Sequence, residues 1–288
     1  MISTPIRRFG AAIIMLLTFS FSTGVIASKH EPKSHKAHTT VSAKTVKTKS
    51  TTLHSKKTAS KKLASSKKEY SRNSELASLP DLRKYPSGTP RKKAFLRTVM
   101  PYITSQNAAI TADRNWLVSK QYEQRWSPSE RTRLKGITQR YKIAWNGNAN
   151  RVPWKQLMEK VDIIPTNMVA TMAAAESGWG TSKLARSNNN LFGMKCGRRH
   201  CNSGSGKVRG YQHYNSVKEG VNAYVINLNT HPAYKSFRKS RAQLRKADQE
   251  VTASNMIHKL KGYSTRGNSY NNYLFAMYQS NQRLMAAN

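Results

Sequence analysis

Residues 28–75 place the strongest constraint on what this chain can fold into, because they contain almost no large apolar side chains. The segment consists mainly of Lys, Ser, Thr and Ala, with 13 basic and 3 acidic residues. Such a composition cannot bury enough apolar surface to offset the entropy lost on folding. We therefore predict that this segment is disordered. The roughly 210 residues that follow are enough to bury a substantial core.

The first 27 residues have the features of an export signal. Arg7 and Arg8 precede the apolar run 11–21, and the sequence 25–27, V-I-A, offers a small-residue cleavage site. The run is shorter than the roughly 20 apolar residues of a transmembrane helix. An uncleaved signal that anchors the protein in the membrane remains the alternative. We predict an exported protein of the periplasm or cell envelope.

The two cysteines, Cys196 and Cys201, are close together in the sequence C-G-R-R-H-C. In an exported protein a close, even pair indicates a disulfide. His200 beside them makes zinc an alternative. Zinc usually takes four ligands, however, and the sequence has no second ligand cluster. We therefore expect no metal site and no cofactor.

The formal net charge is +37, with a sequence pI of about 10.6. The charge is spread evenly, with +10 in residues 28–75, +12 in 76–160 and +13 in 161–288. An even spread indicates a polyanionic partner met over a broad surface rather than a local nucleic-acid site. For an exported protein we expect cell-wall glycan or anionic lipid head groups and no nucleic acid. A charge that only aids solubility is the alternative for the tail.

Helical patterns dominate the rest of the chain. Residues 94–111, 128–141 and 165–175 have the spacing of helices, and the capping box S-V-K-E at 216–219 opens another. Between 192 and 214 the pattern changes to Gly and polar residues, which predicts a short β-hairpin pinned by the cysteines. The fold class is therefore mostly α (α+β). We expect a helical N-terminal extension at 76–160 and a catalytic domain at 161–288.

Glu176 is the first candidate for a catalytic residue. Residues 161–288 contain only five acids against 18 Lys and Arg, and Glu176 ends an otherwise apolar helix in A-A-A-E-S-G-W-G. The helix dipole and the apolar neighbours both disfavour a negative charge there. A carboxyl group that stays protonated is what a general acid needs to protonate a leaving glycosidic oxygen.

The glycines at 178 and 180 allow a sharp turn after this residue, and Trp179 between them could stack on a sugar. The alternative is that Glu176 caps its helix or forms a salt bridge while Trp179 packs in the core.

The stretch E-S-G-W-G-T-S-K-L-A at 176–185, followed by N-N-L-F-G-M-K at 189–195, resembles glycoside hydrolase family 73. These are bacterial β-N-acetylglucosaminidases of peptidoglycan, with the domain also called mannosyl-glycoprotein endo-β-N-acetylglucosaminidase-like. The resemblance continues through Y-N-S-V at 214–217, H-P-A-Y at 231–234 and G-Y-S-T at 262–265, and covers roughly 162–277. The N-terminal extension resembles that of one enterobacterial member.

This resemblance implies a lysozyme-like helical domain with a cleft beside a small β lobe, and Glu176 as general acid. A family tyrosine that assists the reaction corresponds best to Tyr263, with Tyr270 as the nearby substitute. The motifs also assign substrate-binding roles to a group of residues that line the implied cleft: Ser177, Trp179, Asn190, Phe192 and Tyr270. A structural role for either tyrosine is the alternative, since the chain has 13.

One departure from the family stands out. Several relatives place a second acid in the β-hairpin, whereas residues 191–218 here contain no Asp or Glu. Glu219 belongs to the capping box, and Asp248 and Glu250 are typical of a helix start. Three explanations remain: the substrate's acetamido group acts as the nucleophile, Glu219 moves in, or catalysis is weak. We favour the first.

The sequence leaves three other functions open. A lytic transglycosylase also works with one glutamate in a lysozyme-like fold. A wall amidase usually uses zinc, and the histidines of the structured region lack ligand-like spacing. A wall-binding module without activity is the third. The favoured prediction is a peptidoglycan hydrolase, an endo-β-N-acetylglucosaminidase.

Overall fold

The structure is a computed structural model that describes residues 78–123, 125–197 and 206–287. The predicted export signal at 1–27 and the predicted disordered segment at 28–75 lie outside these residues. The described part is mainly helical, which confirms the mostly α part of the predicted class, while the lysozyme-like arrangement stays a prediction. Its α-helices and 3₁₀ helices, in chain order, are η1 Leu82–Lys84, α2 Thr89–Lys120, α3 Pro128–Arg140, η2 Ala149–Arg151, α4 Trp154–Lys160, α5 Thr166–Ser177, α6 Lys183–Asn188, α7 Val217–Thr230, η3 Pro232–Tyr234, α8 Lys235–Lys246, α9 Ala253–Met256, η4 Ile257–Lys259 and α10 Asn268–Ala286.

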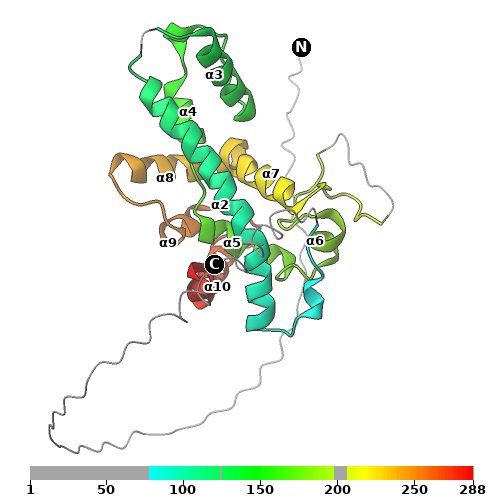
Figure 1. Cartoon of the computed structure of the whole chain (residues 1–288). Helices are drawn as coiled ribbons and strands as arrows, with labels where there is room; N and C mark the ends of the chain where they lie inside the picture. Colours follow the sequence, from blue (N-terminus) through cyan, green and yellow to red (C-terminus); the bar gives the residue numbers. More distant parts are fainter. Residues whose placement is uncertain (1–77, 124, 198–205, 288) are drawn as a thin grey trace, which may run out of the picture. The chain divides into compact units, whose positions relative to one another are not determined.

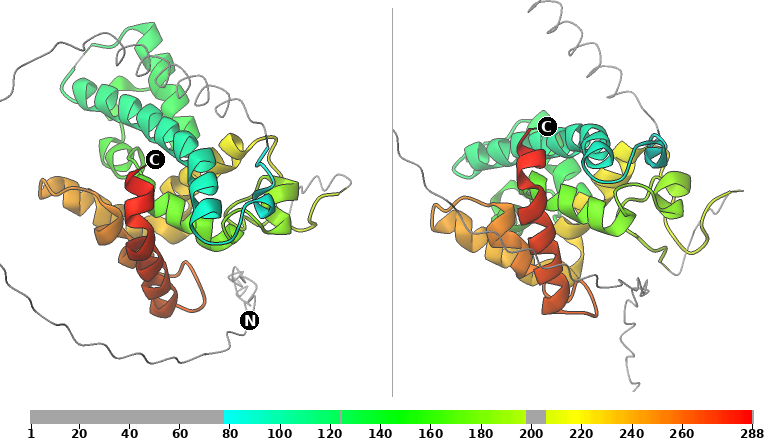
Figure 2. Two further views of the ribbon diagram at one scale, coloured as in Figure 1. Left: turned by 60° about the horizontal axis from the view of Figure 1, so that its bottom comes forward. Right: turned by 90° about the horizontal axis from the view of Figure 1, so that it is seen from below.

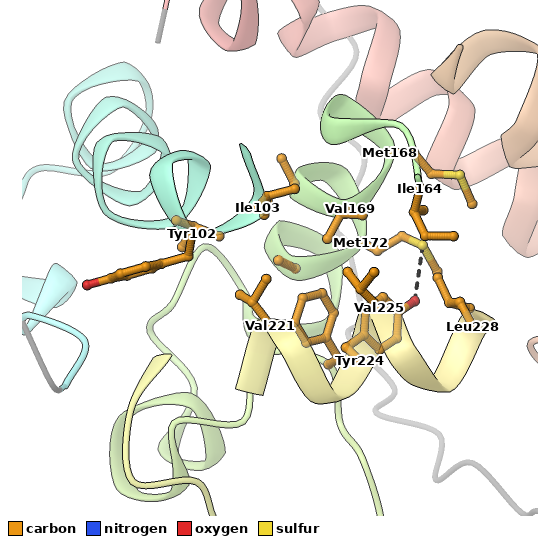
Figure 3. Packing of buried hydrophobic residues seen from close by; sticks show 14 of the residues in the cluster. Tyr102, Ile103, Ile164, Met168, Val169, Met172, Val221, Tyr224, Val225 and Leu228 are labelled. Carbon is orange, nitrogen blue, oxygen red and sulfur yellow. Dashed lines mark hydrogen bonds between the residues drawn. The ribbon is translucent and has the colours of Figure 1, made fainter. Parts of the chain in front are cut away.

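Helix α5 lies at the centre of the core. Seven consecutive residues of it, 168–174, are buried, so the helix is covered on every side. Helices α2, α9 and α10 pack against it, and α7 packs against α2. Figure 3 shows side chains of α2, α5 and α7 meeting in this core, with Met172 and Tyr224 joined by a hydrogen bond. The small residues at 173–175 let the neighbouring helices approach closely.

Helix α2 is the longest described element, with 32 residues. It is longer at both ends than the predicted helix 94–111, because Gly88 and Pro90 start it earlier and Leu117 continues its buried face beyond Thr111. Figures 1 and 2 show α3 and α4 beside its C-terminal end, while α5, α7 and α10 lie nearer its other half.

The predicted extension and the predicted catalytic domain share one hydrophobic core. Buried residues of α2, such as Phe95 and Ile103, belong to the same cluster as Met168 of α5 and Val221 of α7. The division into domains at 160 stays a prediction. What the structure shows is that α2 forms part of the support for α5.

The predicted β-hairpin at 192–214 is reduced, in the part of it that the structure describes, to a single antiparallel bridge between Lys195 and Tyr211. Backbone hydrogen bonds still join the two arms, from Cys196 N to the Gly210 carbonyl at 3.1 Å and from Gln212 N to the Met194 carbonyl at 2.9 Å, and two side-chain amides add further bonds. Asn190 bonds both backbone groups of Met194 and the carbonyl of Gln212. Asn188 bonds both backbone groups of Val208 and the same carbonyl of Gln212.

Among the described residues, no helix combines the length and the apolar character needed to cross a membrane.

Candidate active site at the end of helix α5

Glu176 is the second-last residue of α5, and the chain turns sharply after it. Gly178, Trp179 and Gly180 all have positive φ angles, of 58°, 57° and 78°. Three left-handed residues in a row explain the two glycines, which adopt this conformation at little cost. The turn ends where Ser182 caps α6 by accepting a hydrogen bond from the Ala185 amide.

Ser177 holds this turn from inside. Its side chain is fully buried, and its Oγ donates to the Ala173 carbonyl at 2.5 Å and accepts from the Gly180 amide at 2.8 Å. The predicted substrate contact of Ser177 stays untested. In the described geometry, the hydroxyl is engaged within the protein.

Gly180 marks a close contact between the turn and the N-terminal helices. A Cβ at this position would lie 2.5 Å from Leu82 Cδ1 and 2.9 Å from Leu79 Cδ2. Trp179 packs edge-on against Phe95 of α2, with ring centroids 5.6 Å apart, and Lys92 Nζ lies 5.1 Å from its ring. Trp179 is half-buried, so its predicted contact with sugar stays open, but one edge of the ring is used to join α5 to α2.

The Glu176 carboxylate meets α10 and the loop after α6. Tyr270 of α10 donates a hydrogen bond from its hydroxyl to Glu176 Oε1. On the other side, a Cβ on Gly193 would lie 3.8 Å from Glu176 Oε2, and Gly193 has a φ of 64°. Glycine at this position keeps the space beside the second carboxylate oxygen clear of a side chain.

Burial raises the pKa of Glu176, and the hydrogen bond from Tyr270 only partly offsets this increase. Burial disfavours the charged form, whereas a donated hydrogen bond favours it. The net shift is towards a carboxyl group that keeps its proton at higher pH than usual. That is the state that a general acid requires.

Four tyrosines gather around this carboxylate, and we call Tyr224, Tyr234, Tyr263 and Tyr270 the tyrosine cluster. The rings of Tyr263 and Tyr270 are stacked with centroids 5.7 Å apart, and Tyr234 lies 6.2 Å from Tyr263. The hydroxyls of Tyr224 and Tyr263 are 3.2 Å apart and share a hydrogen bond. Burial raises the pKa of each hydroxyl, and the nearby Glu176 charge raises it further. All four therefore stay neutral.

The two tyrosines considered from the sequence have different positions. Tyr270, considered as the substitute, is the one that touches Glu176, whereas Tyr263 stands behind it and bonds Tyr224. The predicted catalytic role of Tyr263 stays untested. The sequence pointed to no role for Tyr234 or Gly193 at the acid, although both lie within the motifs H-P-A-Y and L-F-G-M-K.

Two other predicted site residues face inwards. Phe192 is buried and stacks on Tyr224, with ring centroids 3.8 Å apart and an angle of 4°. Asn190 is buried and makes the loop contacts described above. Their substrate contacts stay predictions, and their structural role is to shape the wall next to the tyrosine cluster.

The other acids of the domain either form structural contacts or are exposed. Ser216 caps α7 by accepting from Glu219 N at 3.1 Å, as predicted, but Glu219 Oε2 accepts from the Asn215 amide at 2.8 Å rather than from the Ser216 amide that a full capping box would use. Asp162 is buried among three arginines. Asp248 and Glu250 are exposed, and the expected helix start is wrong, because Thr252 is the residue that caps α9.

The predicted disulfide stays a prediction, because Cys201 lies outside the described residues. Among residues 78–123, 125–197 and 206–287, no three His, Cys, Asp or Glu side chains come together as they would to hold a metal ion.

The mainly helical fold and the partly buried acid at the end of α5 agree with one class of protein. Residues 152–283 match the glucosaminidase family, described as mannosyl-glycoprotein endo-beta-N-acetylglucosaminidase. The chain belongs to this family, as its motifs predicted.

A particular relative matches along the whole length. Protein bax of Escherichia coli (strain K12) is 70% identical over 288 residues, which cover 100% of this chain and 99% of that protein. The similarity therefore includes the N-terminal part that the family match leaves out, and it confirms the resemblance of the extension to an enterobacterial member. No solved structure matches the chain.

Proposed function

We propose that the protein is a peptidoglycan hydrolase, an endo-β-N-acetylglucosaminidase that cleaves the glycan strand next to N-acetylglucosamine with Glu176 as general acid. The observation that carries the proposal is the partly buried carboxyl group of Glu176, whose pKa is raised and which accepts a hydrogen bond from Tyr270. Membership of the glucosaminidase family supports a glycan as the substrate class.

In this mechanism the protonated Glu176 transfers its proton to the glycosidic oxygen as the bond to C1 breaks. The proton transfer leaves a carboxylate, and the Tyr270 hydroxyl is already placed to donate to it. A hydrogen bond to a charged acceptor is stronger than one to a neutral group, so Tyr270 stabilises the product state of this step. The four tyrosines of the cluster are neutral, so they place no positive charge next to the Glu176 carboxylate.

The reaction also needs a nucleophile for C1, where positive charge develops as the glycosidic bond breaks. In a retaining enzyme with two carboxyl groups, these groups lie about 5 Å apart. The other described acids of the domain accept a backbone hydrogen bond at a helix start, pair with arginines or are exposed. We infer that the substrate's own acetamido oxygen attacks C1. Glu176 then removes a proton from the water that opens the resulting ring, which restores the carboxyl group.

A glycan-strand substrate implies a place outside the cytoplasm. We propose export to the periplasm or cell envelope through residues 1–27. The basic residues 28–75 would contact wall or anionic lipid, and nucleic acid is not a partner in this proposal.

The test is a digest of purified peptidoglycan by the mature protein, with Glu176→Gln and Glu219→Gln as a pair of matched carboxylate variants. The fragments are reduced and identified by mass spectrometry. We expect new reducing N-acetylglucosamine ends from the parent and from Glu219→Gln, and none from Glu176→Gln.

Other products would replace the proposal. Anhydro-muramic ends identify a lytic transglycosylase, a reaction that Glu176 could also serve as the only catalytic acid. Released stem peptides whose formation is stopped by a chelator identify a zinc amidase. Binding without fragments, equal in the parent and in Glu176→Gln, identifies a wall-binding module.

A further inference from the structure

Four of the five tryptophans of the chain lie far from Glu176 in the sequence, at positions 116, 126, 145 and 154. Three of them form an aromatic group where α2, α3 and α4 meet. Trp126 meets Trp116 at right angles, with centroids 5.9 Å apart, and Trp154 lies 6.1 Å from Trp126. The guanidinium of Arg133 covers the Trp116 ring at 4.5 Å.

A pocket of about 570 Å³ opens beside this group, and we call it the tryptophan pocket. Its lining residues come from the end of α2, the loop after it, η2 and the start of α4: Gln121, Glu123, Arg125, Trp126, Ala149, Asn150 and Trp154. The volume falls in the range of small-molecule binding sites. Glu123 is held on two sides: its carbonyl accepts from Trp126 Nε1 at 3.2 Å, and its Oε2 lies 2.5 Å from Lys120 Nζ.

The chemistry of the lining is mixed. Trp154 is half-buried and Trp126 lies behind it, so indole rings form the apolar wall. Gln121 and Asn150 supply amide donors and acceptors, while Glu123 and Arg125 supply one charge of each sign. An apolar ring face surrounded by polar groups suits a sugar, which presents C–H faces and a rim of hydroxyl and acetamido groups.

The balanced charge of the pocket argues against an anionic ligand. The chain carries a net +37, and a phosphate or nucleic-acid site on it would be expected to gather its basic residues. Here one acid accompanies one base. The largely polar lining likewise does not suit a lipid chain or an apolar peptide.

The tryptophan pocket is separate from the surroundings of Glu176. Trp179, three residues after Glu176, contacts α2 at Phe95, and Gln121 follows the last residue of the same helix. At 1.5 Å per residue, these two points are about 39 Å apart along α2. Figure 1 shows α3 and α4 at that far end. Most of the pocket residues also precede 152, where the family match begins.

We propose that the tryptophan pocket is a second saccharide-binding site that takes an uncharged stretch of the glycan strand at a distance from the cleavage site. The choice of a glycan strand as the source rests on the proposed function. A polymer held at both places would stay on the enzyme between cuts, whereas a short oligosaccharide would reach only one of them at a time.

Binding is tested by calorimetry with the mature protein carrying Glu176→Gln, so that the ligand is not cleaved. The probe is a β-1,4-linked N-acetylglucosamine hexamer, used in about 1 M salt, where charge attraction by the basic segments is screened to about 3 Å. Two variants remove the pocket in different ways: Trp154→Ala takes away the ring, and Gln121→Ala with Asn150→Ala takes away the exposed amides without touching the core. Gln139→Ala, an exposed amide of α3 that does not line the pocket, is the matched control.

We expect two binding events in the parent and in Gln139→Ala. Affinity of one event should fall about tenfold or more in Trp154→Ala and in the double variant. With Glu176 restored, the pocket variants should cleave a short soluble glycan at the parental rate and insoluble peptidoglycan more slowly.

Binding in both pocket variants equal to that of the parent would overturn the proposal. Competition by a free stem peptide, with no binding of the hexamer at the pocket, would overturn the saccharide assignment. These binding results do not depend on cleavage, so a failure of the proposed enzymatic activity is seen separately in the digest.

Discussion

Two carboxylates in the same domain, the buried Asp162 and the partly buried Glu176, have pKa values shifted in opposite directions. Burial alone would raise the pKa of Asp162, but Arg241, Arg245 and Arg114 more than offset burial and lower it. Arg245 binds it with two hydrogen bonds, of 3.0 and 3.1 Å. Burial also raises the pKa of Glu176, and a single tyrosine hydroxyl opposes it.

This difference separates a structural acid from a candidate catalytic one. Two of the three arginines around Asp162, Arg114 and Arg241, also bond backbone carbonyls. Arg241 donates to those of Glu159 and Ile163 at 2.9 Å, so the group joins α8 to the end of α4. The negative charge of Asp162 is therefore compensated by ion pairs within the protein. Glu176 accepts from a neutral tyrosine hydroxyl, and its raised pKa means that it holds its proton to higher pH than usual, which is the pattern expected at a functional site.

The largest expected effect is on catalysis. Glu176→Gln should lower the rate of glycan cleavage by about 10²- to 10⁴-fold, because general acid catalysis contributes that much. The amide keeps the shape of the side chain, so the thermal midpoint should not fall. Product formation and thermal unfolding are measured on the same preparations. A variant that unfolds at lower temperature would place Glu176 with Asp162 as a structural acid.

Asp162→Asn should have the reverse pattern. Removing the charge leaves three guanidinium groups without their counter-ion, and breaking a buried ion pair costs about 3–5 kcal/mol. The free energy of unfolding, obtained by urea titration, should fall by that amount while the rate per folded molecule stays the same. A loss of rate in fully folded protein would contradict this separation.

Tyr270→Phe should lower the rate by about tenfold, since a hydrogen bond to a charged group is worth about 1.5–3 kcal/mol. The bond favours the carboxylate, so its loss raises the pKa of Glu176 further. The falling limb of kcat/KM on the alkaline side should therefore move to higher pH. Tyr263→Phe is the control, because it removes only the bond to Tyr224. A shifted limb in Tyr263→Phe alone would assign the partner role to Tyr263.

Stability should depend on pH with opposite signs for the two acids. In the folded state the pKa of Glu176 is raised above its ordinary value of 4.5. At a pH between the ordinary and the raised pKa, the folded state therefore binds more protons than the unfolded state. Its contribution to stability is full at lower pH and is lost as the pH rises through that window. Asp162, with a lowered pKa, contributes above its ordinary value of 3.8 and loses this as the pH falls.

The matching measurement compares the free energy of unfolding of the parent and Glu176→Gln from about pH 4 to pH 8. Glutamine does not ionise, so the variant should become relatively more stable as the pH rises. A constant difference across this range would show that the pKa of Glu176 is the same in both states.

The smallest effect is expected at Glu219. Glu219→Gln should keep the cleavage rate within about twofold and cost about 1 kcal/mol or less through the weakened cap of α7. A loss comparable to that of Glu176→Gln would make Glu219 the missing second acid and contradict the acetamido mechanism.

The sequence by itself determined the helical class, the family and the position of the candidate acid. These follow from local features: the spacing of apolar residues, the Ser216 cap and the run of motifs around Glu176. It also placed the glycines of the turn, because a left-handed backbone leaves a local signature.

Only the tertiary structure decided which groups surround that acid. Tyr270 lies 94 residues from Glu176 in the sequence and Gly193 comes from another loop, so their proximity depends on how α5, α6 and α10 pack. The same holds for the predicted β-hairpin, which is reduced to a single bridge and to which Asn188 and Asn190 add side-chain bonds across 20 and 22 residues. Local patterns report what a segment can form, whereas the contacts between distant segments come from packing the whole core.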